Sequence, residues 1–129
     1  MRHRFLLLIL VGLCALISGC VTPSRPPVTH PVHGKVRFDG KQLDSGVVEF
    51  QPLDESARHA QGEIQPDGTY ALSILHEGKG VPGAVPGEYR VTVLFMAKAE
   101  KDKRPPIAVE KTYKVVEGDN TFNLELKSP

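Results

Sequence analysis

The sequence contains no tryptophan, and aromatic residues make up only 6% of its 129 residues. A core built from this chain must therefore rely mainly on Val, Ile and Leu side chains. An excess of charge of one sign is also lacking, because 16 Lys and Arg residues face 15 Asp and Glu residues. Phosphate binding needs a clear basic excess or patch, so this balance argues against a nucleic acid as partner.

Catalytic and metal-binding patterns are also missing. No serine lies in the Gly-x-Ser-x-Gly context of a nucleophile, and no glycine run has the spacing of a phosphate-binding loop. The carboxylates Glu49, Asp54 and Glu55 fall on an outward strand face and in a polar loop, where we expect solvated surface. His30 and His33 lack a third ligand nearby, so we expect solvated histidines and no metal. The sequence therefore predicts no cofactor and no enzymatic activity.

The N-terminus has the three parts of an export signal. Arg2 and Arg4 precede an apolar run from Phe5 to Ile17, which is shorter than the roughly 20 residues that a membrane-spanning helix needs. The run ends in Leu16-Ile17-Ser18-Gly19-Cys20, which resembles the lipobox of a bacterial lipoprotein. In that family the cysteine becomes the first residue of the mature chain and carries lipid, palmitate included. An ordinary cleaved signal with an incidental cysteine is the alternative.

Lipidation of Cys20 would decide both compartment and chemistry. The other cysteine, Cys14, leaves with the signal, so no thiol would remain for disulfides, thiolate catalysis or metal binding. Val21 follows the cysteine, where an aspartate can favour inner-membrane retention in proteins of this kind. We therefore expect a lipid-anchored envelope protein, in the outer membrane with a periplasmic or surface face rather than in the inner membrane.

Composition divides the rest of the chain into two parts. The segment up to residue 31 is polar and contains Pro23, Pro26, Pro27 and Pro31, which is typical of an extended tether. The sequence thus predicts a signal peptide at 1–19, a lipidated cysteine and Pro-rich tether at 20–31, and one domain at 32–127.

From residue 32 onward the apolar residues alternate with a period of two, and no stretch holds a helical period for long. Turn signals such as Asp39-Gly40 and Pro66-Asp67-Gly68 separate the alternating runs. Seven runs stand out, at 32–38, 48–50, 60–65, 70–74, 89–95, 113–115 and 122–126. They predict an all-β fold, a seven-stranded antiparallel sandwich, and they favour it over a five-stranded open barrel.

Several stretches keep an order and spacing that is shared with a known family. They are Val32-His33-Gly34-Lys35-Val36, Asp39-Gly40-Lys41-Gln42-Leu43, Gly46-Val47-Val48-Glu49-Phe50, Pro66-Asp67-Gly68-Thr69-Tyr70, the run 85–93, and Gly118-Asp119-Asn120-Thr121-Phe122-Asn123-Leu124. Together they resemble the carboxypeptidase regulatory-like domain, a transthyretin-like (prealbumin-like) Greek-key sandwich, in its small bacterial lipoprotein form. The resemblance covers nearly all of residues 32–127 and implies an accessory or interaction domain without catalysis.

Three functional hypotheses follow. The leading one is a lipid-anchored envelope domain that binds a protein or glycan. Its expected contact surface is the Gly- and Pro-rich loop 78–87 with the apolar residues Val81, Pro82, Val85 and Pro86. The mixed-charge loop 98–104 is expected to be solvated. The alternatives are a structural protein that self-associates through edge strands and a small transthyretin-like hydrolase. The hydroxyisourate hydrolases end in a Tyr-Arg-Gly-Ser-type tetrapeptide, and the ending Leu126-Lys127-Ser128-Pro129 does not match it.

Overall fold

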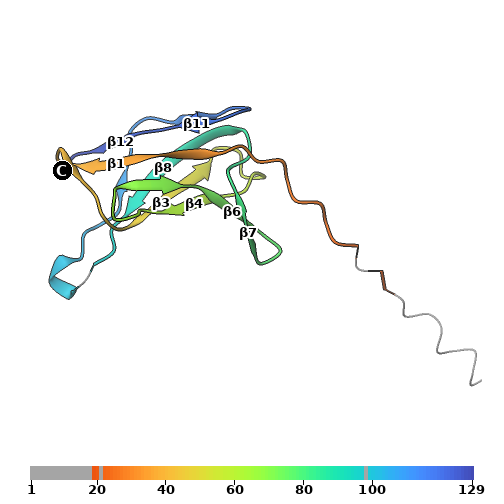
Figure 1. Ribbon diagram of the computed structural model, residues 1–129, viewed down its shortest axis with the longest axis horizontal. Helices are drawn as coiled ribbons and strands as arrows, with labels where there is room; N and C mark the ends of the chain where they lie inside the picture. Colours follow the sequence, from red (N-terminus) through yellow and green to blue (C-terminus); the bar gives the residue numbers. More distant parts are fainter. Residues whose placement is uncertain (1–18, 21, 98) are drawn as a thin grey trace, which may run out of the picture.

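The computed structural model describes residues 19–20, 22–97 and 99–129, so most of the predicted signal peptide lies outside the described residues. The described chain forms two packed β-sheets and one short 3-10 helix, η1 (Glu100–Asp102) (Figure 1). This arrangement confirms the predicted all-β sandwich. No helix in the described ranges is both long enough and apolar enough to cross a membrane.

The larger sheet holds seven antiparallel strands. Its main path runs β10 (Tyr113–Val115), β8 (Gly87–Leu94), β3 (Val47–Pro52), β4 (Ala60–Glu63), β6 (Ser73–His76) and β7 (Lys79–Pro82), and β9 (Ile107–Ala108) also pairs with β8. The centre is the β3–β8 pair, which stays in register from Val47 opposite Leu94 to Pro52 opposite Tyr89. Strands β7 and β9–β10 are the two edges.

The smaller sheet is built around β1 (Val32–Phe38). Two strands pair with it in antiparallel fashion, β2 (Lys41–Gln42) and β5 (Thr69–Ala71). Two others, β11 (Asn120–Thr121) and β12 (Leu124–Leu126), run parallel to it. The alternation did not predict these parallel pairs. They arise because the chain crosses from β10 in the other sheet and enters beside the start of β1, with Asn120 opposite Val32.

The predicted strand at residues 70–74 is two strands. β5 pairs with β1 in the smaller sheet, whereas β6 pairs with β4 in the larger one, so the chain changes sheets at Leu72. The Leu72 N–H donates to the carbonyl of Val32 at 2.9 Å, and its side chain is only 2% exposed. Alternation could not reveal this crossing, because Tyr70, Leu72 and Ile74 all face the same core on either side of it.

The segment predicted as a loop from residue 76 to 87 contains β7. The β6–β7 hairpin turns at Glu77 and Gly78, whose φ angles are 49° and 77°. Gly80 and Pro82 have low strand propensity, which hid this strand from the sequence analysis. An edge position tolerates them, since a proline there removes no inner ladder bond.

The core lies between the sheets and is made mainly of Val, Leu and Ile, as the composition predicted. Three buried tyrosines extend it, and two of them donate their hydroxyls to backbone carbonyls at 2.6 Å, Tyr70 to Phe122 and Tyr89 to Val85. Burial raises the pKa of these two phenols. Gly34 lies directly under the Phe122 carbonyl, where any Cβ atom would collide with the backbone.

Candidate functional site

Three strands bring their ends together at one end of the sandwich. Phe38 is the last residue of β1, Phe95 directly follows β8, and Lys127 directly follows β12. The Phe38 and Phe95 rings pack edge to face, with centroids 5.4 Å apart and planes at 74°. The predicted inward direction of both rings is correct, but both are only partly buried. They form the floor of an open groove.

This Phe38–Phe95 groove has a volume of about 520 Å³, within the usual range for ligand sites. It is lined by Phe38, Phe95, Arg104, Pro105, Pro106, Ile107, Lys127, Ser128 and Pro129. The floor and most of the walls are apolar. Arg104 and Lys127 are exposed on it, and none of the described lining residues is acidic.

Arg104 covers the aromatic floor. Its guanidinium carbon lies 5.2 Å from the centroid of Phe38 and 5.9 Å from that of Phe95, within the range of cation–π attraction. Its neighbour Lys103 is instead paired with Glu100 at 2.7 Å. Within the loop that was predicted to be solvated, Arg104 is therefore held against a partly apolar surface, with its charged plane still open to solvent.

The C-terminal wall of the groove is tied to the turn after β1. Asp39 adopts a left-handed φ of 49°, and its N–H donates to the carbonyl of Leu126 at 2.9 Å. Its carboxylate accepts the Ser128 N–H at 2.9 Å. This hydrogen bond, with smaller contributions from the charges of Arg104 and Lys127, lowers the pKa of Asp39 below its usual 3.8. The backbone and the carboxylate of Asp39 therefore hold the C-terminal residues in place as the wall of the groove.

A second hollow of about 550 Å³ continues from the groove along the open side of the sandwich. It lies between the β9–β10 edge and β12, and it shares Ile107 and Lys127 with the groove. Within the described chain, β12 pairs only with β1, and β9 only with β8. Two strand edges without a neighbouring strand therefore border this hollow.

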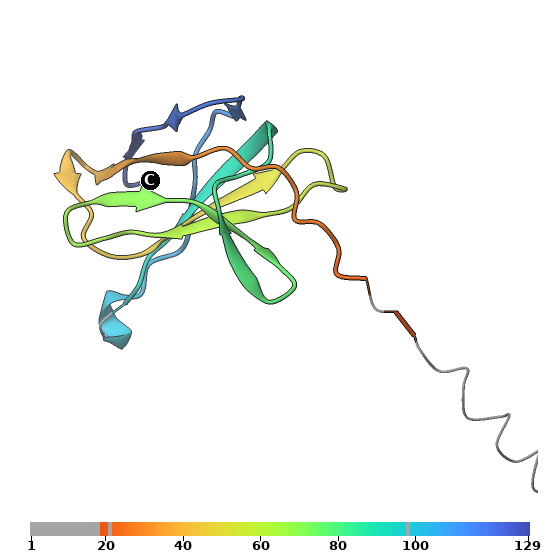
Figure 2. The same cartoon turned by 45° about the vertical axis from the view of Figure 1, so that its right-hand side comes forward.

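The opposite end of the sandwich holds the N-terminal segment. His30 and Ala84 exchange backbone hydrogen bonds of 2.9 and 3.0 Å. Farther out, the Ser24 hydroxyl donates to a Glu77 carboxylate oxygen at 2.6 Å. The backbone carbonyl oxygen of Ser24 lies 3.2 Å from Nε2 of the buried His76. The hydrogen bond from Ser24 lowers the pKa of Glu77. Residues 24–30 are therefore docked along the β6–β7 hairpin, and they form no helix (Figure 2).

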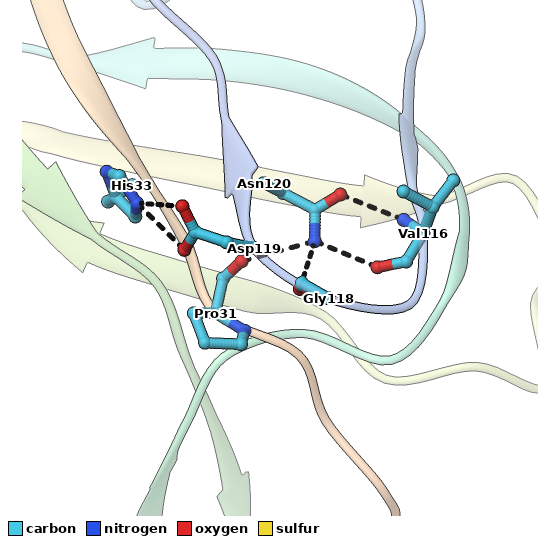
Figure 3. Close-up of polar contacts among 6 residues, drawn as sticks. All are labelled: Pro31, His33, Val116, Gly118, Asp119 and Asn120. Carbon is cyan, nitrogen blue, oxygen red and sulfur yellow. Dashed lines mark hydrogen bonds and ion pairs between the residues drawn. The ribbon is translucent and has the colours of Figure 1, made fainter.

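Buried polar contacts fix the start of β1 at this same end (Figure 3). The Asn120 amide donates to the carbonyls of Val116, Gly118 and Pro31 at 2.9, 3.1 and 3.2 Å. Its carbonyl oxygen accepts the Val116 N–H at 2.9 Å. On the surface beside it, His33 Nε2 lies 3.0 Å from Asp119. All of these groups are satisfied within the chain.

The histidines and carboxylates found in the sequence acquire partners that the sequence did not show. His30 is half-buried and its Nδ1 accepts the Gly118 N–H at 3.1 Å, so the expectation of a solvated histidine was wrong there, whereas His33 is exposed. His59 lies 3.6 Å from Glu49, and Asp54 accepts bonds from the N–H and hydroxyl of Ser56. The described residues contain no group of three His, Cys, Asp or Glu side chains that could hold a metal ion.

The predicted contact loop divides into buried and exposed residues. Val81 and Val85 are partly buried against the core, contrary to the expected exposure, because β7 and the docked N-terminal segment fold them inward. Pro82 and Pro86 are exposed. Binding through this loop stays a prediction, although the Pro82 carbonyl already accepts a hydrogen bond from Thr29 at 2.7 Å.

Sequence reasoning missed the groove. Phe38 and Phe95 were assigned to the core, and Arg104 to a solvated loop. The available signal was the aromatic residue at the end of each of the two longest strands, together with Arg104 placed directly before Pro105-Pro106. The packing of the two sheets brings Phe38 to Phe95, and the parallel pairing of β12 with β1 places Lys127 beside Phe38; the pattern encodes neither.

Comparisons with known proteins add little. No family model and no curated protein matches the sequence. A solved structure that resembles the chain is that of a DUF3823 family protein from Parabacteroides merdae, at 19% identity and a TM-score of 0.45. The match covers 78% of this chain and 46% of that one, so the chain spans about half the length of that protein. A likeness of this size carries no functional argument.

Proposed function

We propose that this protein is a lipid-anchored envelope module of the carboxypeptidase regulatory-like type that binds a partner and performs no catalysis. Acylation of Cys20, on the outer membrane, would hold it at the surface. The observation that carries the proposal is the placement of the two ends. The N-terminal segment leaves from one end of the sandwich, and β1 and β12 end at the other (Figures 1 and 2). The open Phe38–Phe95 groove lies at these strand ends.

The docking of Ser24 sets the geometry of such an anchor. Ser24 lies four Cα-to-Cα steps after Cys20, and these steps span at most about 14 Å when fully extended. Cys20 is exposed and free to carry a modification. The β6–β7 hairpin would then stay close to the lipid. Strand β1 spans about 20 Å from Val32 to Phe38, so the groove would face away from the membrane.

The two ends also differ in what they can offer a partner. At the hairpin end, His30, Asn120 and Ser24 already bond within the chain. At the groove end, the Arg104 guanidinium and the exposed edge of the aromatic floor remain accessible. A partner in the periplasm or outside the cell would therefore meet the groove end first.

Fractionation of cells that express the full chain tests the anchor. Growth with a palmitate analogue should label the protein and place it in the membrane fraction. Cys20→Ser should abolish the label and release the protein, whereas the matched control Ser18→Ala should leave both unchanged because small residues are retained at the cleavage site. A soluble, unlabelled parent chain would refute the anchor, and turnover of a substrate by the purified protein would refute the non-catalytic role.

A further inference from the structure

We infer that the Phe38–Phe95 groove binds an extended segment of a partner protein that carries a carboxylate beside apolar side chains. The inference deepens the proposed function and rests on it, since an anchored module needs a binding surface. It commits to one occupant, a peptide segment. Three features of the groove carry the argument: its charge, the coverage of its aromatic floor and its continuation along unpaired strand edges.

The charge of the groove is complementary to a carboxylate. Arg104 and Lys127 both line it, and its described lining residues include no acidic side chain. The carboxylate of Asp39, beside the groove, already accepts the Ser128 N–H, and Asp102 lines a separate hollow that adjoins Arg104. Arg104 is held over two rings, which leaves the N–H groups at the edge of its planar guanidinium available for a two-pronged bond to a carboxylate.

The coverage of the floor favours a peptide over a sugar. Sugar rings bind by stacking on open aromatic faces, and the guanidinium of Arg104 lies over both Phe38 and Phe95. What remains open is the apolar wall of Pro105, Pro106 and Ile107, which suits aliphatic or aromatic side chains. A carboxylate at Arg104 would thus have apolar side chains of the same segment on the prolines beside it.

The shape of the surface favours an extended chain. The groove opens into the hollow between the β9–β10 edge and β12, and Ile107 and Lys127 border both. A strand edge without a neighbour offers backbone N–H and C=O groups to an added strand, which is a common mode of peptide recognition. Lipid headgroups are disfavoured, because the groove lies at the end away from the docked N-terminal segment (Figure 1).

The test is a selection with the full chain in detergent micelles against random peptides displayed on phage. Asp or Glu next to apolar residues should be enriched on the parent chain, and this enrichment should disappear with Arg104→Gln. The matched control is Arg90→Gln, which removes an exposed cation from β8 on the outer face of the larger sheet. The best peptide should lose about tenfold in affinity when its carboxylate is replaced by an amide or when Arg104→Gln is introduced.

Each of the following outcomes would overturn the inference. Equal enrichment by the parent and Arg104→Gln chains would show that the groove is not the binding site. An equal loss of enrichment with Arg90→Gln would show that the effect comes from the overall positive charge of the protein and not from the groove. Arg104-dependent binding to phosphatidylglycerol vesicles without peptide enrichment would assign the groove to lipid. Arg104-dependent dimerisation in sedimentation would assign it to a second copy. None of these readouts needs acylation, so failure here is distinct from failure of the Cys20→Ser test.

Discussion

The two ends of the sandwich differ in how far their polar groups are hydrogen-bonded within the chain. At the hairpin end, Asn120 makes four hydrogen bonds within the chain, and Ser24 binds both His76 and Glu77. At the groove end, Arg104 rests on two rings and Lys127 lies exposed on the same groove. Apart from Nδ1 of the buried His76, which has no hydrogen-bond partner among the described residues, these polar groups at the hairpin end are bonded within the chain, whereas Arg104 and Lys127 at the groove end are exposed to a ligand. The difference predicts that substitutions at the first cost stability and at the second cost binding.

The largest loss of stability is expected from Asn120→Ala. The side chain is 4% exposed, and its removal leaves several backbone groups at the turn after β10 without partners. We expect a loss of about 3 kcal/mol in the free energy of unfolding, measured by urea denaturation. Asn123→Ala is the matched control, because Asn123 is exposed and accepts one hydrogen bond from the Lys35 N–H. A loss no larger than in that control would show that the buried contacts do not hold this end.

The aromatic floor of the groove should affect both the stability of the fold and the binding of peptides. Phe38→Ala removes a partly buried ring that packs on Phe95 and lies under Arg104. Because the ring is not fully buried, we expect a loss of about 2 kcal/mol in unfolding free energy, together with loss of peptide enrichment. Phe38→Leu should recover most of the stability and little of the binding. Full binding by the Phe38→Leu chain would separate the ring from the function of the groove.

Docking of the N-terminal segment should depend on pH. Because the Ser24 hydrogen bond lowers the pKa of Glu77 in the folded chain, docking is favoured above the usual carboxyl value of 4.5 and is lost as the pH falls through the lower folded value. The protection factor of the Ser24 N–H, which corrects exchange for the intrinsic rate at each pH, should fall on acidification while that of the β8 amides does not. Glu77→Gln should remove this dependence, whereas Ser24→Ala should weaken it only in part, because the backbone N–H of residue 24 still donates to Glu77. A protection factor that stays constant over this pH range in the parent chain would contradict the assigned role of Glu77.

The smallest effect on stability is expected from Arg104→Gln. The residue is exposed, and its cation–π contacts at such a site are worth about 0.5–1 kcal/mol, partly retained by the glutamine stem. The unfolding midpoint in urea should therefore move little, although peptide selection fails. A destabilisation as large as that of Phe38→Ala would show that Arg104 supports the fold. Substitutions at the groove end would then cost stability as they do at the hairpin end.

The sequence predicted the local elements better than their connections. Alternation located β1 at residues 32–38 without error and marked Val48 and Phe50 as buried, because one buried face imposes a period of two. It could not locate the sheet change at Leu72 or the parallel pairing of β12, since inward residues look alike on both sheets. The groove depends on the pairing of β12 with β1 and on the packing of the two sheets, so its residues were recognised one by one and never as a site.

The distance of each end from the membrane tests the central claim most directly. Cys20 would be blocked by lipid, so single fluorophores can be attached through Lys79→Cys on β7 and Lys41→Cys on β2, both exposed. The lipidated chain is then placed in nanodiscs that contain headgroup quenchers. We expect strong quenching at position 79 and little at position 41, next to the groove end. Equal quenching at both positions, or the reverse order, would contradict a groove that faces away from the anchor.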